Sequence, residues 1–203
     1  MKKFVLPDNL KHLKRSQIET RDENFINVFV DALAISNPKN ILETGVFWGI
    51  STISLLTISN ANLTSFDPII NVNDDDNLKQ GTPYPDKSEQ EQFLNQIKLT
   101  FGDRWTFYKE KSENAYDLIK NNKYDLFHID GDHWYSGLDA DYDLAVKMDI
   151  EWLLIDDFND IVAKKFMEKL ARYYIPIRTY QRDNIPIVLF KKIGKINLPN
   201  FSQ

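Results

Sequence analysis

The sequence predicts an α/β fold in which helices cover a mostly parallel sheet. Apolar, strand-like runs alternate with helical runs along most of the chain, and residues 40–67 read as a compact strand–helix–strand unit. Two further strand-like runs, 175–180 and 185–192, follow one another near the end with only a short turn between them. The length of 203 residues predicts one domain, spanning residues 1–203.

The first expected element is a helix over residues 16–36. Ser16 and Glu19 form a capping-box pattern at its start. Apolar residues then repeat at helical spacing, and Pro38 lies just beyond the expected end. Residues 1–38 are therefore expected to form an N-terminal helical segment of the same domain.

The remaining elements alternate between strand and helix. The expected strands are apolar runs bounded by turn-forming or acidic residues, at 40–45, 62–67, 105–108, 124–130, 152–156, 175–180 and 185–192. The expected helices show helical spacing of apolar residues, at 51–60, 87–101, 113–121, 136–148 and 161–173. Residues 69–86 contain an Asp74–Asp76 run, Gly81 and two prolines, and we expect them to be a mobile lid loop.

Composition narrows the class of partner. The net charge of −5 is unfavourable for binding a phosphate backbone, so no nucleic-acid partner is expected. The chain has no cysteine, which excludes thiolate metal sites and disulfides within it. No long apolar run follows the start, so neither a signal peptide nor a membrane partner is expected. A cytoplasmic protein is expected, and its oligomeric state, a homo-oligomer included, stays open.

A glycine turn joins the strand at 40–45 to the next helix, with the pattern Glu43-x-Gly45-x-x-x-Gly49. Glycines there allow a sharp turn and close approach of a ligand to the backbone. A nicotinamide-binding fold would show Gly-x-Gly-x-x-Gly, but Phe47 occupies the second glycine position. The turn instead resembles the Glu-x-Gly-x-x-x-Gly motif of class I S-adenosylmethionine-dependent methyltransferases. A turn that binds no ligand is the alternative.

An acidic residue supports an adenosyl cofactor. Asp67 ends the second strand, where an acid can accept hydrogen bonds from both ribose hydroxyls. The alternative is a simple cap before Pro68. The resemblance adds Ser51, Ser112 and Asp130 to Glu43, Gly45, Gly49 and Asp67 as expected cofactor-binding residues. Ser112 is equally a candidate helix N-cap.

The most specific segment runs from Asp130 to Gly137 and reads Asp-Gly-Asp-His-Trp-Tyr-Ser-Gly. It resembles the Asp-Gly-x-His-x-Tyr-x-Gly pattern of a methyltransferase subgroup that includes the macrolide-sugar O-methyltransferases and is related to the catechol and caffeoyl-coenzyme A enzymes. The resemblance extends from about Ile41 to Phe190. It implies a Rossmann-like, mostly parallel seven-stranded sheet with helices on both faces and a terminal antiparallel strand pair. It also implies methyl transfer to a hydroxyl of a small molecule, a sugar or other vicinal diol.

The same resemblance places metal ligands on Asp130, Asp156 and Asp157. These acids end two strands whose carboxyl ends meet at one edge of a parallel sheet. Oxygen-only ligands suit Mg²⁺. The Asp-Asp pair at 156 and 157 departs from the Asp-Asn of the catechol type and matches the sugar-modifying relatives. Helix caps and turn formers are the alternative for these acids.

His133 falls where the related enzymes place a general base, and histidine can accept a proton near neutral pH. A structural or metal-binding role for His133 is the alternative. Two other functions stay open: a metal-independent methyltransferase, and a non-catalytic or different-chemistry protein on the same fold.

Overall fold

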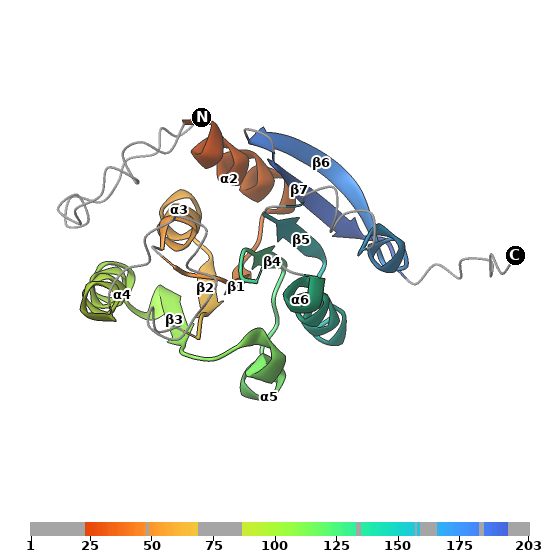
Figure 1. The fold of residues 1–203 in the computed structure, drawn as a ribbon. Coiled ribbons are helices and arrows are strands. Elements are labelled where there is room, and N and C mark those ends of the chain that lie inside the picture. The colour runs from red at the N-terminus through yellow and green to blue at the C-terminus, as the bar shows by residue number, and fades with distance from the viewer. Residues whose placement is uncertain are drawn as a thin grey trace, which may run out of the picture.

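Seven strands form one sheet in the order β3-β2-β1-β4-β5-β7-β6 (Figure 1). The computed structural model describes residues 23–47, 49–68, 87–132, 135–156, 158, 166–182 and 185–194. The strands are β1 (Asn40–Thr44), β2 (Asn62–Phe66), β3 (Trp105–Tyr108), β4 (Leu126–Ile129), β5 (Trp152–Ile155), β6 (Tyr174–Arg182) and β7 (Ile185–Lys192).

The pairing confirms the predicted sheet. β1 pairs in parallel with β2 and β4, β2 with β3, and β4 with β5. β7 pairs antiparallel with both β5 and β6. The chain order along the sheet reverses between β1 and β4. That point is a topological switch point, the place where open α/β sheets bind ligands beyond the carboxyl ends of their strands.

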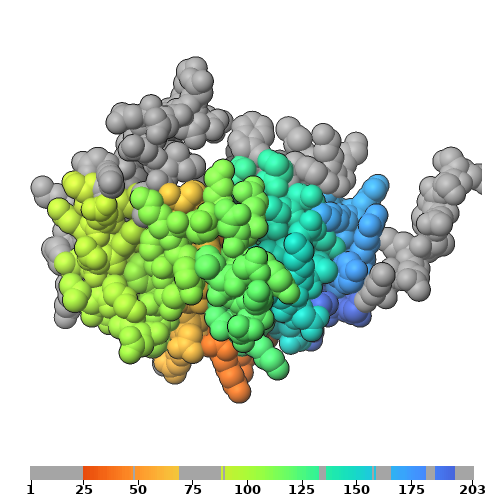
Figure 2. Space-filling view, turned by 90° about the horizontal axis from the view of Figure 1, so that it is seen from below, coloured from red at the N-terminus to blue at the C-terminus, as the bar shows by residue number. Residues whose placement is uncertain are grey.

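Helices cover both faces of the sheet, as predicted (Figure 1). The described helices are α2 (Glu23–Ser36), α3 (Ile50–Ile58), α4 (Lys87–Phe101), α5 (Ala115–Ile119) and α6 (Tyr135–Lys147), with 3-10 turns η3 (Gly102–Arg104) and η4 (Ser112–Asn114). Residues 166–170 are also helical. The predicted helix at 113–121 is thus split into η4 and the shorter α5. Figure 2 shows α5 and α6 on one face, between α4 on one side and β6 on the other.

Two apolar cores form because side chains alternate across each strand. On one face Ile41 packs with α2, α3 and α4, through residues such as Phe29 and Ile53. On the other, Leu42 packs with α5, α6 and Phe166. α3 is buried along most of its length, its serine and threonine residues Ser51, Thr52 and Ser54 included.

The N-terminal helix belongs to the same unit as the sheet. α2 contributes Phe25 and Phe29 to the first core. Its Asp31 accepts a hydrogen bond of 2.8 Å from the Tyr180 hydroxyl on β6. None of the helices among the described residues is long and apolar enough to cross a membrane. Ser16, Glu19, the loop at 69–86 and the first part of the helix at 161–173 lie outside the described residues.

Candidate cofactor and metal site

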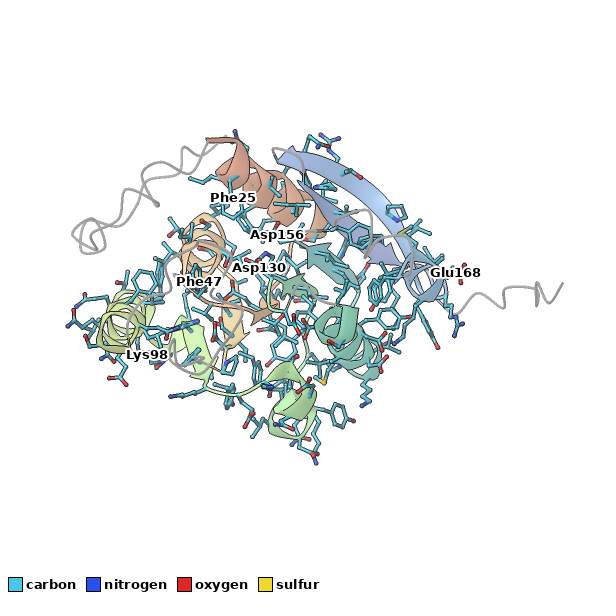
Figure 3. The ribbon with its side chains drawn as sticks, viewed as in Figure 1. Phe25, Phe47, Lys98, Asp130, Asp156 and Glu168 are labelled. Carbon is cyan, nitrogen blue, oxygen red and sulfur yellow. The ribbon has the colours of Figure 1, made fainter. Side chains whose placement is uncertain are left out.

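The parallel strands bring most of the predicted site residues to one edge of the sheet. Backbone hydrogen bonds continue beyond the strand ends: Gly45 N–H to Phe66 O at 3.0 Å, and Asp130 N–H to Thr44 O at 3.0 Å. Figure 3 shows Asp130 and Asp156 near the middle of the sheet, with Phe47 on the neighbouring turn. The glycine turn and the acids that follow β4 are therefore neighbours at the switch point.

Gly45 is required by its contact with the next strand. Its φ is 82°, in the left-handed region. A Cβ at this position would lie 1.9 Å from the carbonyl oxygen of Asp130. Only glycine at position 45 therefore allows the turn to pack this closely against the end of β4.

Gly49 is required for a different reason. It stands at the N-cap of α3 with φ 63° and offers no capping side chain. A Cβ here would lie 2.2 Å from Cε1 of Phe93 on α4. The second glycine of the motif thus lets α4 pack against the start of α3. Between the two glycines, Phe47 itself has a left-handed φ of 45°.

Asp67 fixes the glycine turn from the end of β2. Its Oδ2 accepts hydrogen bonds from the backbone N–H groups of Val46 at 2.8 Å and Phe47 at 2.9 Å. The side chain is half-buried beside the turn. This hydrogen-bonding role is neither the ribose contact nor the simple cap weighed from the sequence. Binding of a ribose by Asp67 stays a prediction.

Glu43 lies beneath the turn, in the protein interior. It has no exposed surface, and its Oε2 accepts hydrogen bonds of 2.7 Å from Thr52 on α3 and Ser65 on β2. Trp105 Nε1 donates to Ser65 Oγ at 3.0 Å, and His128 Nδ1 lies 3.5 Å from Glu43 Oε1. The contacts described for Glu43 are to protein groups that anchor β1. Direct contact with a cofactor stays a prediction.

The register across the sheet could not be anticipated from the motif. Glu43 pairs with Ser65 on β2 and with His128 on β4, so the three side chains share one face. His128, placed in the sequence within an apolar strand, is fully buried. Ser51 is also buried, in the first turn of α3.

Ser112 opens η4, in the turn that follows β3. The alternative of a helix N-cap at this residue is wrong for α5, whose N-cap position is Asn114. Ser112 instead hydrogen-bonds a carboxylate that was not predicted from the sequence. That carboxylate is Asp141 on α6, only 1% exposed, with Oδ2 accepting a 2.9 Å hydrogen bond from Thr44 Oγ1.

The electrostatics of Asp141 are unusual. Its pKa is raised to about 6 from its ordinary value of 3.8, mainly by burial and to a smaller extent by the negative charges of Asp132 and Glu113. Hydrogen bonding by Ser112 and Thr44 acts in the opposite direction. A signal existed in the sequence: Leu138, Asp141, Tyr142 and Ala145 follow helical spacing, and all are buried. An acid on the buried stripe of an amphipathic helix indicates a special site.

Packing also explains the two glycines of the second motif. A Cβ on Gly131 would lie 3.3 Å from Cβ of Thr44, so the turn after β4 runs tightly against β1. A Cβ on Gly137 would lie 2.3 Å from Cβ of Asp132. Gly137 therefore makes room on α6 for the same turn, and the Asp-Gly-x-His-x-Tyr-x-Gly pattern describes a close contact between a loop and a helix.

Of the predicted metal ligands, the structure describes Asp130 and Asp156. Asp130 is half-buried and Asp156 is 6% exposed. They follow Ile129 and Ile155, which are paired residues of β4 and β5, and Asp156 N–H donates to Ile129 O at 2.9 Å. Two carboxylates at adjacent strand ends are hard oxygen donors of the type that Mg²⁺ takes.

The rest of the predicted metal and catalytic set falls outside the described part. Asp157 and His133 are not among the described residues. Within those residues, no group of three histidine, aspartate or glutamate side chains could hold a metal ion. The full ligand set and the general base therefore stay predictions.

Comparisons with solved structures agree with this fold. The O-methyltransferase TomG from Streptomyces achromogenes, involved in tomaymycin synthesis and solved with S-adenosylmethionine, has a TM-score of 0.66 at 13% identity, over 93% of this chain and 91% of TomG. The Podospora anserina methyltransferase PaMTH1, bound to S-adenosylhomocysteine, has 0.63 at 14%, over 92% and 88%. An rRNA methylase from Streptococcus thermophilus has 0.57 at 13%, over 83% and 96%.

The family follows from the sequence itself. No curated protein matches the chain. Residues 42–158, from β1 to just beyond β5, match the family model described as a methyltransferase domain. That stretch contains the glycine turn, Asp67 and the acids after β4 and β5. The chain belongs to the methyltransferase domain family, and this confirms the class I S-adenosylmethionine-dependent methyltransferase predicted from its motifs.

Proposed function

We propose that this protein is a Mg²⁺-assisted O-methyltransferase that transfers the methyl group of S-adenosylmethionine to a hydroxyl of a small molecule, a sugar or other vicinal diol. The observation that carries the proposal is the position of Asp130 and Asp156. They end neighbouring strands at the switch point, beside the glycine turn. Oxygen donors and a nucleotide-type turn thus share one edge of the sheet.

The reaction requires alignment and removal of a proton. The acceptor oxygen attacks the methyl carbon, the carbon–sulfur bond breaks, and its electron pair stays on sulfur, which loses its positive charge. Bound by Asp130, Asp156 and Asp157, Mg²⁺ would supply Lewis-acid polarisation of the acceptor hydroxyl. His133, by its place in the motif, would accept the hydroxyl proton. Gly45 and Asp67 would position the cofactor.

Two observations favour a small acceptor over ribosomal RNA. One solved structure with this fold is an rRNA methylase, so the fold alone permits either acceptor. The net charge of −5 opposes binding to a phosphate backbone. The second motif, from Asp130 to Gly137, resembles that of enzymes acting on sugar hydroxyls.

The decisive experiment is methyl transfer to a panel of sugars and catechol-type diols, with and without a chelator. Activity should vanish in excess chelator and return with Mg²⁺. Asp156→Ala should abolish transfer yet bind S-adenosylhomocysteine almost as the wild type does, because Asp156 follows β5, which β4 separates from β1 and its glycine turn. Asp117→Ala, which removes a surface acid of α5, is the matched control and should keep full activity.

Full activity in excess chelator would leave the acids as structural elements and favour the metal-independent enzyme. Methylation of ribosomal RNA, with none on the small-molecule panel, would overturn the acceptor class.

The role of His133 is tested separately. His133→Ala should keep metal binding and lose rate by about 10²–10⁴-fold, the range for a positioned general base. Calorimetric titration with Mg²⁺ measures the first quantity and single-turnover kinetics the second. Loss of metal binding in this variant would instead make His133 a ligand.

A further inference from the structure

Asp141 joins the two turns that flank the cofactor edge. It lies on the buried face of α6, where Thr44 Oγ1 donates to its Oδ2 at 2.9 Å. Thr44 is the residue immediately before Gly45 of the glycine turn. From η4, the hydroxyl of Ser112 acts on the same carboxylate. One side chain thus contacts the end of β1 and the turn after β3.

The surroundings of this carboxylate disfavour its ionised form. It is nearly fully buried, and the charged residues that act on it, Asp132 and Glu113, are both acids. A costly buried acid that links two ligand-facing turns calls for a role beyond packing.

We propose that Asp141 is a positioning residue of the cofactor site: its carboxylate holds Thr44 and Ser112 in the arrangement that receives the adenosyl part of S-adenosylmethionine. This inference rests on the proposed function, because it takes the glycine turn and η4 as the cofactor-binding turns. Asp141 acts through its two hydroxyl partners and need not touch the cofactor itself.

A pH dependence follows from this arrangement. The ionised carboxylate accepts hydrogen bonds from both hydroxyls, whereas the protonated form keeps less accepting capacity. Its pKa is raised to about 6 in the cofactor-free protein, so the accepting form prevails above pH 6. The affinity for S-adenosylhomocysteine should be full above that pH and fall below it, by up to about tenfold per pH unit.

The test measures the dissociation constant of S-adenosylhomocysteine by calorimetry between pH 5 and pH 8 in three variants and the wild type. Asp141→Asn keeps the shape but removes the charge, and Thr44→Val removes the donor and keeps the volume. Asp143→Asn, the same change on an exposed part of α6 where the acid pairs with Lys169, is the matched control.

We expect Asp141→Asn to weaken binding about tenfold at pH 8, as loss of a hydrogen bond to a charged group would. The fall in affinity near pH 6 should disappear with it. Thr44→Val should weaken binding in the same direction, and Asp143→Asn should follow the wild type. In the assay, the cofactor KM should rise while kcat stays within a few-fold of the wild type.

Two failures are distinguishable. If the wild type binds no S-adenosylhomocysteine at any pH, the cofactor assignment fails and the role of Asp141 falls with it. If the wild type binds, and folded Asp141→Asn shows the wild-type affinity and the same fall near pH 6, only the role of Asp141 is overturned. An Asp141→Asn protein that loses stability but keeps the pH profile would likewise show a purely structural residue.

Discussion

At the scale of single residues, the site contains two buried acids, Glu43 and Asp141, in different surroundings. Glu43 is held by Thr52 and Ser65, and Ser65 in turn receives the indole N–H of Trp105. These hydrogen bonds connect Glu43 on β1 to α3, β2 and β3. Asp141 also has two hydroxyl donors, Thr44 and Ser112, but burial and two acidic neighbours raise its pKa, so its charged form opposes folding.

The sign of this effect predicts a stabilising substitution. Because the folded-state pKa of Asp141 is raised above the ordinary value of 3.8, the destabilisation of the fold by its ionisation is complete above about pH 6. That cost disappears as the pH falls below the unfolded-state value. The shift corresponds to a free energy on the order of 3 kcal/mol. We therefore expect Asp141→Asn to unfold at higher denaturant concentration than the wild type at pH 8.

Denaturant unfolding of the two proteins at several pH values measures this difference. The advantage of Asp141→Asn should stay constant between pH 8 and about pH 7, where the acid is ionised in both the folded and the unfolded state, and shrink as the pH falls from about 6 towards 4. An advantage that stays constant down to about pH 4 would show that charge is not its origin.

At the scale of elements, two glycines with a left-handed φ distinguish the cost of backbone strain from the cost of a steric clash. Gly49 and Gly102 have nearly the same φ, 63° and 58°. A Cβ at Gly49 would meet Phe93 and Ile97 of α4, whereas a Cβ at Gly102 would meet nothing within 4 Å. Gly102→Ala should cost only the backbone strain, about 1–2 kcal/mol. Gly49→Ala should cost a further 1–3 kcal/mol or so, because α4 must shift.

Unfolding free energies of the two alanine variants test this comparison. The double variant Gly49→Ala with Phe93→Leu should lose less than the sum of its single changes, because the smaller side chain relieves the clash. Equal losses for Gly49→Ala and Gly102→Ala would mean that α3 and α4 adjust freely.

Element type was predictable where periodicity is strong. The helix at 87–101 was placed with its observed bounds, and every predicted strand lies in the sheet. The structural roles of single residues were harder to predict from the sequence. Gly49 reads as a ligand-facing turn residue, yet its tight contact is with Phe93, a partner fixed only by tertiary packing. The role of Asp141 was not predicted, because a helical pattern alone does not show that Thr44 donates a hydrogen bond to it.

At the scale of the whole molecule, the site depends on both halves of the sheet. β1 and β2 supply the glycine turn and Asp67, while β4 and β5 supply Asp130 and Asp156. The two cores on opposite faces fix these strands in one register. The site residues therefore come together only when the whole sheet is formed. A ligand bound at this edge should stabilise the whole fold, since it binds the native state and not the unfolded chain.

S-adenosylhomocysteine should accordingly raise the melting temperature. At a free concentration of 100 times Kd the stabilisation is about 2.7 kcal/mol. For a chain of this size, about 2–4 °C per kcal/mol gives a rise of about 5–11 °C. Asp67→Ala should lose most of this rise, because it removes the predicted ribose acceptor and the anchor of the Val46 and Phe47 N–H groups.

Asp125→Ala is the matched control for Asp67→Ala. The Asp125 carboxylate also accepts two backbone N–H groups, from Lys39 at 2.8 Å and Asn40 at 2.9 Å, but at the opposite end of β1. Both variants should melt below the wild type without ligand, since each leaves two N–H groups without their acceptor. Only Asp125→Ala should keep the full rise with S-adenosylhomocysteine. A full rise in Asp67→Ala as well would remove Asp67 from the cofactor site and leave it as an anchor of the turn alone.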